Sequence, residues 1–254
     1  MPDEQRPQRR GGVRPSAVVS AVGRIADECG ARLGRPLEVL DLGGGTGGVA
    51  VPLAEAGHRV TVVDPSPDAL AALARRAREA GIVDRVTGVQ GDGDSLDALL
   101  AGRQVDLACC HGTLEFVDDP TATLRAIAHA LGEGGVLSLL VSGRLSVVFA
   151  KAIAGEFTQA RAALVDPSGR WGSTDPLPRR FDVEQLESLL ADAGFTDVRV
   201  RGTNIFGHLV PASLIDSEAD RFALAELDDL LVSGPGREFL RTLGNALHVL
   251  ARRD

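Results

Sequence analysis

Short apolar runs alternate with helical stretches through the first half of the chain. The runs with strand-like composition are residues 37–42, 59–64, 85–90, 105–110 and 135–142. The clearest helical stretches between them are 67–81 and 119–132. The second of these starts at an Asp-Pro pair and ends at Gly132, which are typical start and stop signals of a helix. Strands that alternate with helices predict βαβ units, and therefore a parallel sheet with helices on both faces.

The hydrophobic pattern changes after residue 142. We expect a helical segment, a Pro/Gly/Ser-rich loop, a helix, a strand, a helix and a final strand, in this order: 143–164, 166–181, 182–195, 196–206, 217–233 and 245–253. Two strands this close to the C-terminal end predict an antiparallel hairpin at the edge of the sheet.

These elements predict a single α/β domain over residues 1–254. Its expected fold is a Rossmann-like, doubly wound sheet of seven strands, mostly parallel with an antiparallel C-terminal edge hairpin. The expected parts are an N-terminal arm and helix, a cofactor-binding core, a helical lid or substrate segment, and the C-terminal part of the sheet: 1–34, 35–142, 143–180 and 181–254.

A glycine-rich loop follows the first predicted strand. Residues 41–48 read Asp-Leu-Gly-Gly-Gly-Thr-Gly-Gly, which contains G-x-G-x-x-G and, counted from Asp41, also D-x-G-x-G-x-G. Glycines at this place let the backbone turn tightly and approach a ligand without interference from a Cβ atom. Because G-x-G-x-x-G is typical of dinucleotide sites, an NAD-dependent dehydrogenase is one interpretation of the loop.

Two aspartates near the glycine-rich loop bear on which ligand it binds. Asp41 suits a ligand with a positive ammonium group and is badly placed beside a pyrophosphate. Asp64 closes the second predicted strand, where a carboxylate can accept hydrogen bonds from both hydroxyls of a ribose. The alternative for Asp64 is a helix cap for the stretch that begins near Pro67.

With these acidic residues, the loop resembles that of the class I S-adenosylmethionine-dependent methyltransferases. Further similarities are Gly91-Asp92-Gly93 after the third strand and Leu131-Gly132-Glu133-Gly134-Gly135 before the fifth, where the family has L-x-P-G-G. The family also ends its sheet with an antiparallel hairpin. The resemblance implies S-adenosyl-L-methionine as cofactor, bound by Asp41, Gly43, Gly44, Gly45, Gly47, Asp64, Asp92, Gly93 and His111. We expect Asp94 or Ser95 to cap the next helix, which leaves Asp92 free for the adenine.

Several segments resemble one branch of this family, the bacterial tRNA 5-carboxymethoxyuridine methyltransferases, which esterify a modified wobble uridine. They are GGVR (11–14), LDLGGGTG (40–47), HGTLEFVDDP (111–120), GGVLSLL (134–140), AGEFTQA (154–160), LPRRF (177–181) and NALHVLARR (245–253). The resemblance implies that Arg14 binds the cofactor, and a guanidinium suits the carboxylate of the methionine moiety. The alternative for Arg14 is a solvated residue of the arm.

The substrate side of that branch is poorly matched. The branch has a lysine-rich stretch where this chain has only Arg170, and it differs at Ser142, Gly143, Asn204 and Gly207. The remaining candidates for contact with a tRNA anticodon are Arg144, Arg170, Arg179 and Arg180, with Trp171 available for stacking on a base. The expected partner is therefore either a modified tRNA anticodon or a small-molecule substrate.

The expected reaction is an in-line displacement that moves a methyl group from a sulfonium to a nucleophile. A carboxylate is ionised at pH 7 and needs no base, but an arginine is wanted to orient it, and Arg144 or Arg180 is the candidate. A hydroxyl, phenol or amine acceptor needs a base, and His111 is then the predicted catalytic residue. The alternative for His111 is a structural histidine at the end of a strand, with its hydrogen bonds satisfied. Glu115 and His129 are expected to be surface or packing residues, and His58 is expected to have no role.

Composition bears on partners and location. The chain has 27 basic and 35 acidic residues and a net charge of −8, which argues against bulk electrostatic binding of nucleic acid. Cys29, Cys109 and Cys110 have no metal-ligand spacing, so we expect no metal site and reduced thiols. The polar N-terminal stretch and the short apolar runs predict no signal peptide, no membrane contact and a cytoplasmic location.

Overall fold

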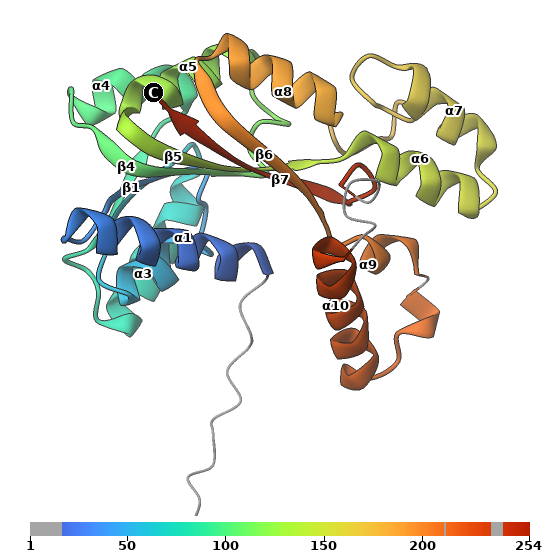
Figure 1. Cartoon of the computed structure of the whole chain (residues 1–254), viewed down its shortest axis with the longest axis horizontal. Coiled ribbons are helices and arrows are strands. Elements are labelled where there is room, and N and C mark those ends of the chain that lie inside the picture. The colour runs from blue at the N-terminus through green and yellow to red at the C-terminus, as the bar shows by residue number, and fades with distance from the viewer. Residues whose placement is uncertain (1–16, 211, 235–240) are drawn as a thin grey trace, which may run out of the picture.

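The computed structural model describes residues 17–210, 212–234 and 241–254. They form a seven-stranded sheet in the order β3-β2-β1-β4-β5-β7-β6, with helices on both faces (Figure 1). The strands are β1 Glu38–Leu42, β2 Arg59–Asp64, β3 Val86–Gln90, β4 Val105–His111, β5 Leu131–Ser142, β6 Phe195–Thr203 and β7 Ala246–Arg253. The predicted Rossmann-like, mostly parallel sheet is thereby confirmed.

The helices follow the predicted order. Their bounds are α1 Ala17–Leu33, α2 Ala50–Glu55, α3 Pro67–Ala80, α4 Leu96–Leu100, α5 Pro120–Ala130, α6 Arg144–Ile153, α7 Phe157–Val165, α8 Val183–Asp192, α9 Phe206–Leu209 and α10 Glu218–Ser233, with short 3-10 turns at Gly93–Ser95 and Ala212–Leu214. None of the helices in the described ranges is long and apolar enough to cross a membrane.

The antiparallel part of the sheet consists of β7. This strand lies between β5 and β6 and runs antiparallel to both, so β6 forms the edge and runs in the same direction as the first five strands. Strand β7 therefore joins the C-terminal part of the chain to the centre of the fold.

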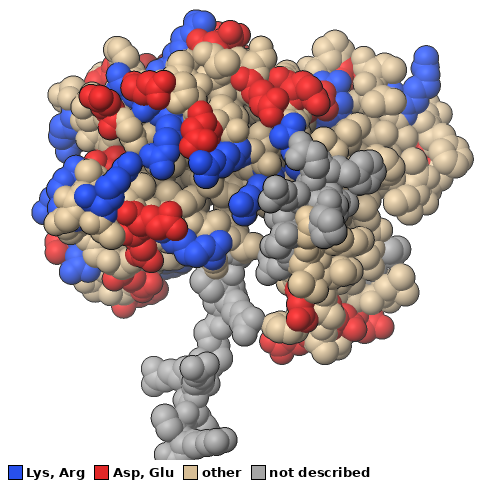
Figure 2. All heavy atoms as spheres, in the orientation of Figure 1, with Lys and Arg blue, Asp and Glu red and all other residues tan. Residues whose placement is uncertain are grey.

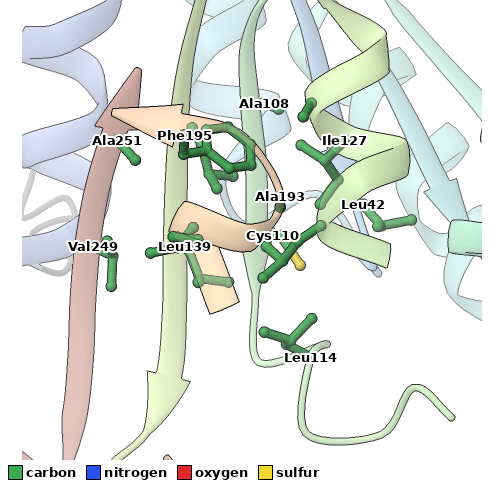
Figure 3. Packing of buried hydrophobic residues seen from close by; sticks show 14 of the residues in the cluster. Leu42, Ala108, Cys110, Leu114, Ile127, Leu139, Ala193, Phe195, Val249 and Ala251 are labelled. Atoms are coloured by element: carbon green, nitrogen blue, oxygen red, sulfur yellow. The ribbon is translucent and has the colours of Figure 1, made fainter. Parts of the chain in front are cut away.

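Buried apolar residues form one cluster on each face of the sheet. The first lies under α5 and α8 and includes Cys110, Ile127, Leu139 and Val249 (Figure 3). The second lies under α1, α2 and α3. Because both faces are covered, the strand sequences read as nearly continuous apolar runs, which is typical of a parallel sheet.

Three predicted helices have different bounds in the structure. The helix predicted over 182–195 is α8, which ends at Asp192, and Phe195 already begins β6. The segment 143–164 is two helices, because the chain turns at Gly155, whose φ of 76° is in the left-handed region. The helix predicted to end at Gly132 ends at Ala130, because Leu131 is already paired with Val105 in the sheet.

Candidate functional site

The predicted cofactor residues meet at one edge of the sheet, where parallel strands have their carboxyl ends. The glycine loop follows β1, Asp64 is the last residue of β2, Asp92 follows β3 and His111 is the last residue of β4. In open α/β sheets this edge is where ligands bind. The fold thus brings these predicted residues to one edge of the sheet.

The glycine loop fits closely against the protein itself. A Cβ atom on Gly43 would lie 1.9 Å from Thr113 Oγ1, and one on Gly44 would lie 2.4 Å from Asp41 Oδ2. Gly47 combines a φ of +83° with a Cβ position 2.4 Å from Leu73 Cδ1. Glycine is therefore required at these positions by packing as well as by any ligand.

Asp64 supports the glycine loop from the end of β2. Its Oδ2 accepts a hydrogen bond from the backbone N–H of Gly45 at 2.9 Å, and its Oδ1 accepts one from Ser66 at 2.9 Å. Ser66, not Asp64, caps α3 by accepting from the N–H of Ala69. A carboxylate offers about four acceptor sites, so two remain for ribose hydroxyls. The ribose contact itself stays a prediction.

Asp41 is a buried carboxyl group whose lost contacts with water are only partly replaced by hydrogen bonds from the protein. Burial, with the negative charge of Asp64 as a second cause, raises the pKa of Asp41 to about 7, although the N–H of Ala50 donates to it. Asp41 Oδ2 has no hydrogen-bond partner among the described residues. A buried acceptor beside a second carboxylate suits a positively charged donor on a ligand. The ammonium group of S-adenosylmethionine fits this description.

Asp92 has a capping role that was not predicted from the sequence. It is itself the cap of the 3-10 turn: Asp92 Oδ1 accepts from the N–H of Ser95 at 3.1 Å, and Ser95 Oγ accepts from the N–H of Asp92 at 2.9 Å. Asp94 or Ser95 was expected to cap the next helix; Ser95 does take the N-cap position of α4, but its side chain makes no cap hydrogen bond there. Gly93 is buried against Thr123, where a Cβ atom would lie 2.9 Å from Thr123 Cγ2. Adenine contacts by Asp92 and Gly93 remain predictions.

His111 belongs to a buried hydrogen-bonded group that the sequence did not reveal. Its Nε2 lies 2.9 Å from Ser138 Oγ, which lies 2.9 Å from Nε2 of His248. Burial, followed by the neighbouring His248, lowers the pKa of His111 to about 4. Burial, followed by the charge of Arg201, lowers the pKa of His248 to about 4. Both imidazoles are therefore neutral at pH 7, and the low pKa makes His111 a weak base. A role of His111 as general base stays a prediction.

Glu115 is buried rather than on the surface and lies in the turn after β4, not in a helix. Its Oε1 accepts hydrogen bonds from the N–H of Ser142 at 2.7 Å and from Ser142 Oγ at 3.0 Å. Its Oε2 has no partner within the described part of the chain. Glu115 thus connects the β4 turn to the end of β5, directly before the lid helix α6. A lone glutamate in the sequence carries no signal for this contact.

The two arginines expected to bind substrate contact the loop between α7 and α8 in the structure. Arg144 donates to the backbone oxygens of Asp166 and Pro167, at 3.1 and 2.7 Å, and pairs with Asp182. Arg180 is buried and makes two hydrogen bonds to Asp175, at 2.6 and 2.9 Å. Both guanidinium groups are therefore already bound by the protein itself, and a contact of either arginine with substrate stays a prediction.

The other candidates for RNA contact are also engaged. Lys151 Nζ lies 4.1 Å from the centre of the Trp171 ring and pairs with Glu156, so one face of the ring is covered. Arg170 donates to the oxygen of Gly172, and Arg179 to the oxygen of Asp118, at 3.4 and 3.5 Å respectively. Arg14 lies outside the described residues. No cluster of three metal-binding side chains occurs within those residues.

Removing Asp175 is expected to loosen the lid. An Asp175→Ala change leaves the guanidinium of Arg180 buried without its carboxylate, which destabilises a protein by about 3 kcal/mol or more. Urea unfolding and hydrogen exchange of residues 166–182 measure this effect. Arg59→Ala, which removes the exposed ion pair with Glu38, is the matched control and should cost less than about 1 kcal/mol. Equal losses in both variants would contradict the role of the buried pair.

The fold, with a glycine loop and carboxylates at the carboxyl ends of β1 and β2, is typical of enzymes that bind a nucleoside-containing cofactor. A family model described as a methyltransferase domain matches residues 15–200, and the chain belongs to this family. It is an S-adenosylmethionine-dependent methyltransferase, which decides against the dehydrogenase interpretation of the glycine loop.

Individual relatives differ in what they methylate. The tRNA 5-carboxymethoxyuridine methyltransferase of Escherichia coli (strain K12) is 29% identical over 96% of this chain and 89% of that protein. The ubiquinone biosynthesis O-methyltransferase of Xanthomonas axonopodis pv. citri is 38% identical over 46% of this chain and 48% of that protein. The Burkholderia thailandensis 1,6-didemethyltoxoflavin-N1-methyltransferase, solved with 1,6-didemethyltoxoflavin and S-adenosylhomocysteine, has a TM-score of 0.53 at 24% identity and covers 93% of this chain and 78% of that chain. This last similarity shows the fold alone.

Proposed function

We propose that this enzyme transfers the methyl group of S-adenosylmethionine to a carboxylate oxygen, and that its first candidate acceptor is 5-carboxymethoxyuridine at the wobble position of tRNA. The observation that carries the proposal is the 29% identity to the Escherichia coli tRNA enzyme over 96% of this chain. This similarity extends over nearly the whole length and so includes the predicted lid segment 143–180 and β7.

The chemistry of the site supports an acceptor that is already ionised. The bound cofactor supplies an electrophilic methyl group on its sulfonium. In this chain, Asp41 and Asp64 are the residues proposed to hold the ammonium and the ribose of the cofactor. A carboxylate nucleophile needs no proton acceptor at pH 7, which agrees with the low pKa of His111. The protein then contributes alignment and exclusion of water.

A small-molecule acceptor is the second candidate, and a specific observation favours it. The described arginines and Trp171 proposed for an anticodon are bound to other groups of the protein, as shown above. Figure 2 shows basic and acidic side chains interspersed over the core, and acidic side chains gather at one end of α10, which begins with Glu218 and Asp220. A surface of this kind attracts polyanionic RNA weakly.

The first experiment measures methyl transfer from radiolabelled S-adenosylmethionine to tRNA that carries unmethylated 5-carboxymethoxyuridine, and in parallel to small carboxylic acids and phenols. Methyl esters are hydrolysed by mild alkali and methyl ethers are not, so alkali release of the label identifies a carboxylate acceptor. Labelled tRNA that loses its methyl group in alkali supports the proposal. Alkali-stable label, or label on small molecules alone, overturns its acceptor.

The cofactor side is tested by calorimetric titration with S-adenosylmethionine. We expect Asp64→Ala to weaken binding about tenfold or more, the size of a lost hydrogen bond to a charged group. The control is Asp84→Ala, which replaces an exposed aspartate after α3 and should bind as the unmodified enzyme does. Unchanged affinity in Asp64→Ala would remove the ribose role of that residue.

A further inference from the structure

The residues around His111 lie in one row on the face of the sheet. Across β4, β5, β7 and β6, the strand register places His111, Leu140, His248 and Arg201 opposite one another. Ser138 lies two residues before Leu140 on β5, so its side chain points to the same face. Its hydroxyl can therefore reach the rings on either side of Leu140. The two rings are in an edge-to-face arrangement with their centroids 6.1 Å apart.

Because Ser138 and the two neutral histidines share few hydrogens, the tautomer of one ring depends on the tautomer of the other. A serine hydroxyl has one hydrogen to donate, and Ser138 Oγ lies 2.9 Å from Nε2 of both His111 and His248. Each neutral imidazole carries one hydrogen, on Nδ1 or on Nε2. Ser138 Oγ could accept from both Nε2 atoms, but its buried hydroxyl hydrogen would then have no side-chain acceptor among the described residues. Donating to one Nε2 and accepting from the other satisfies all three groups. The two histidines must therefore be in opposite tautomers.

The position of Arg201 selects between the two arrangements. Arg201 lies on β6, on the other side of β7 from Ser138, and its positive charge acts on His248. A nearby cation favours the tautomer whose N–H points away from it. His248 then carries its hydrogen on Nε2 and donates to Ser138, and Ser138 donates to Nε2 of His111. The hydrogen of His111 is then left on Nδ1.

We propose that Ser138 and His248 are positioning residues that hold His111 as a hydrogen-bond donor through Nδ1, so that His111 cannot take a proton from the methyl acceptor. The site would then select acceptors that are already ionised, and a donor N–H would suit an anionic oxygen of the ligand or substrate. This use of the donor rests on the proposed function, whereas the tautomer itself is a property of the protein without any acceptor.

The test is nitrogen-15 NMR of the full chain with labelled histidine at pH 7.5, read from two-bond and three-bond couplings within the rings. His→Gln variants assign the five histidines. His58 is an internal reference, because its Nδ1 accepts from the N–H of Leu37 and its hydrogen must lie on Nε2. We expect the Nδ1–H tautomer for His111 and the Nε2–H tautomer for His248. The same tautomer in both rings, or Nε2–H in His111, overturns the proposal.

Two variants test whether the coupling passes through Ser138. Ser138→Ala should leave His111 as a mixture of tautomers or convert it to Nε2–H. His248→Gln, whose amide N–H₂ can still donate to Ser138, should keep Nδ1–H in His111, whereas His248→Leu should not. An unchanged tautomer in both Ser138→Ala and His248→Leu would show that these residues are only structural. A negative methyl-transfer assay would not affect this result, because the spectra need no acceptor.

Discussion

An Asp41→Asn variant should be more stable than the unmodified protein and bind S-adenosylmethionine much more weakly. Burial raises the pKa of Asp41 to about 7, against a reference value of 3.8. Between these two pH values the folded state keeps a proton that the unfolded state has lost, so stability falls as the pH rises from about 4 to 7. Asparagine resembles the protonated carboxyl and avoids this cost. At pH 8 the gain in unfolding free energy should reach up to about 4 kcal/mol.

The two expected effects of Asp41→Asn, on stability and on affinity for the cofactor, can be measured separately. Urea unfolding at pH 5 and pH 8 should show a gain that grows with pH, while calorimetry should show an affinity at least tenfold lower. The control is Asp84→Asn, an exposed change that should alter neither quantity. A variant that is destabilised at pH 8, or that binds the cofactor normally, would show that Asp41 is not kept as an unpaired carboxylate for a cationic ligand.

A methyl group on Gly43 should both destabilise the fold and disturb the cofactor loop. In Gly43→Ala the new Cβ would lie 1.9 Å from Thr113 Oγ1, and the φ of +71° is unfavourable for alanine. The left-handed conformation costs about 1–2 kcal/mol and the overpacking about 1–3 kcal/mol, so we expect a total loss near 3 kcal/mol. Thermal unfolding and cofactor titration measure the two consequences.

The matched control for Gly43→Ala is Gly48→Ala, in the same loop. A Cβ atom on Gly48 meets no atom within 4 Å, and its φ is not in the left-handed region, so the change should be within about 0.5 kcal/mol of neutral. Adding Thr113→Ala to Gly43→Ala should recover part of the steric loss but not the conformational loss, which a double-mutant cycle separates. Equal stability of the two single variants would contradict the close packing of Gly43 against Thr113.

The fold was predictable from the sequence because its strands are short apolar runs bounded by turn residues. The glycine loop directly follows β1 and Asp64 is the last residue of β2, so the parallel order of the strands brings them together at one edge. The break between α6 and α7 was not recognised, although Gly155 is the residue that permits it. Helical periodicity continues across a single left-handed residue, and the pattern alone does not separate the two helices.

The parts of the site that were missed depend on contacts between distant residues. Ser138 and His248 are 110 positions apart and meet only because β7 inserts beside β5. Arg180, in the predicted lid segment, was expected to orient a carboxylate acceptor, but it pairs with Asp175 within the same loop. Charge and position along the chain do not reveal which carboxylate a guanidinium will pair with after folding.

The position of β7 also affects how the protein can fold as it is synthesised. Each of the strands β2 to β5 can pair with a strand that has already left the ribosome. Strand β6 has no such partner, because its one neighbour in the described sheet, β7, leaves the ribosome after it. The edge of β5 that pairs with β7 also stays unpaired until then. Unpaired edges and long-range pairing make folding slow and prone to aggregation. We therefore expect nascent chains that are stalled before residue 246 to depend on chaperones, and release of the β7 segment to complete the sheet.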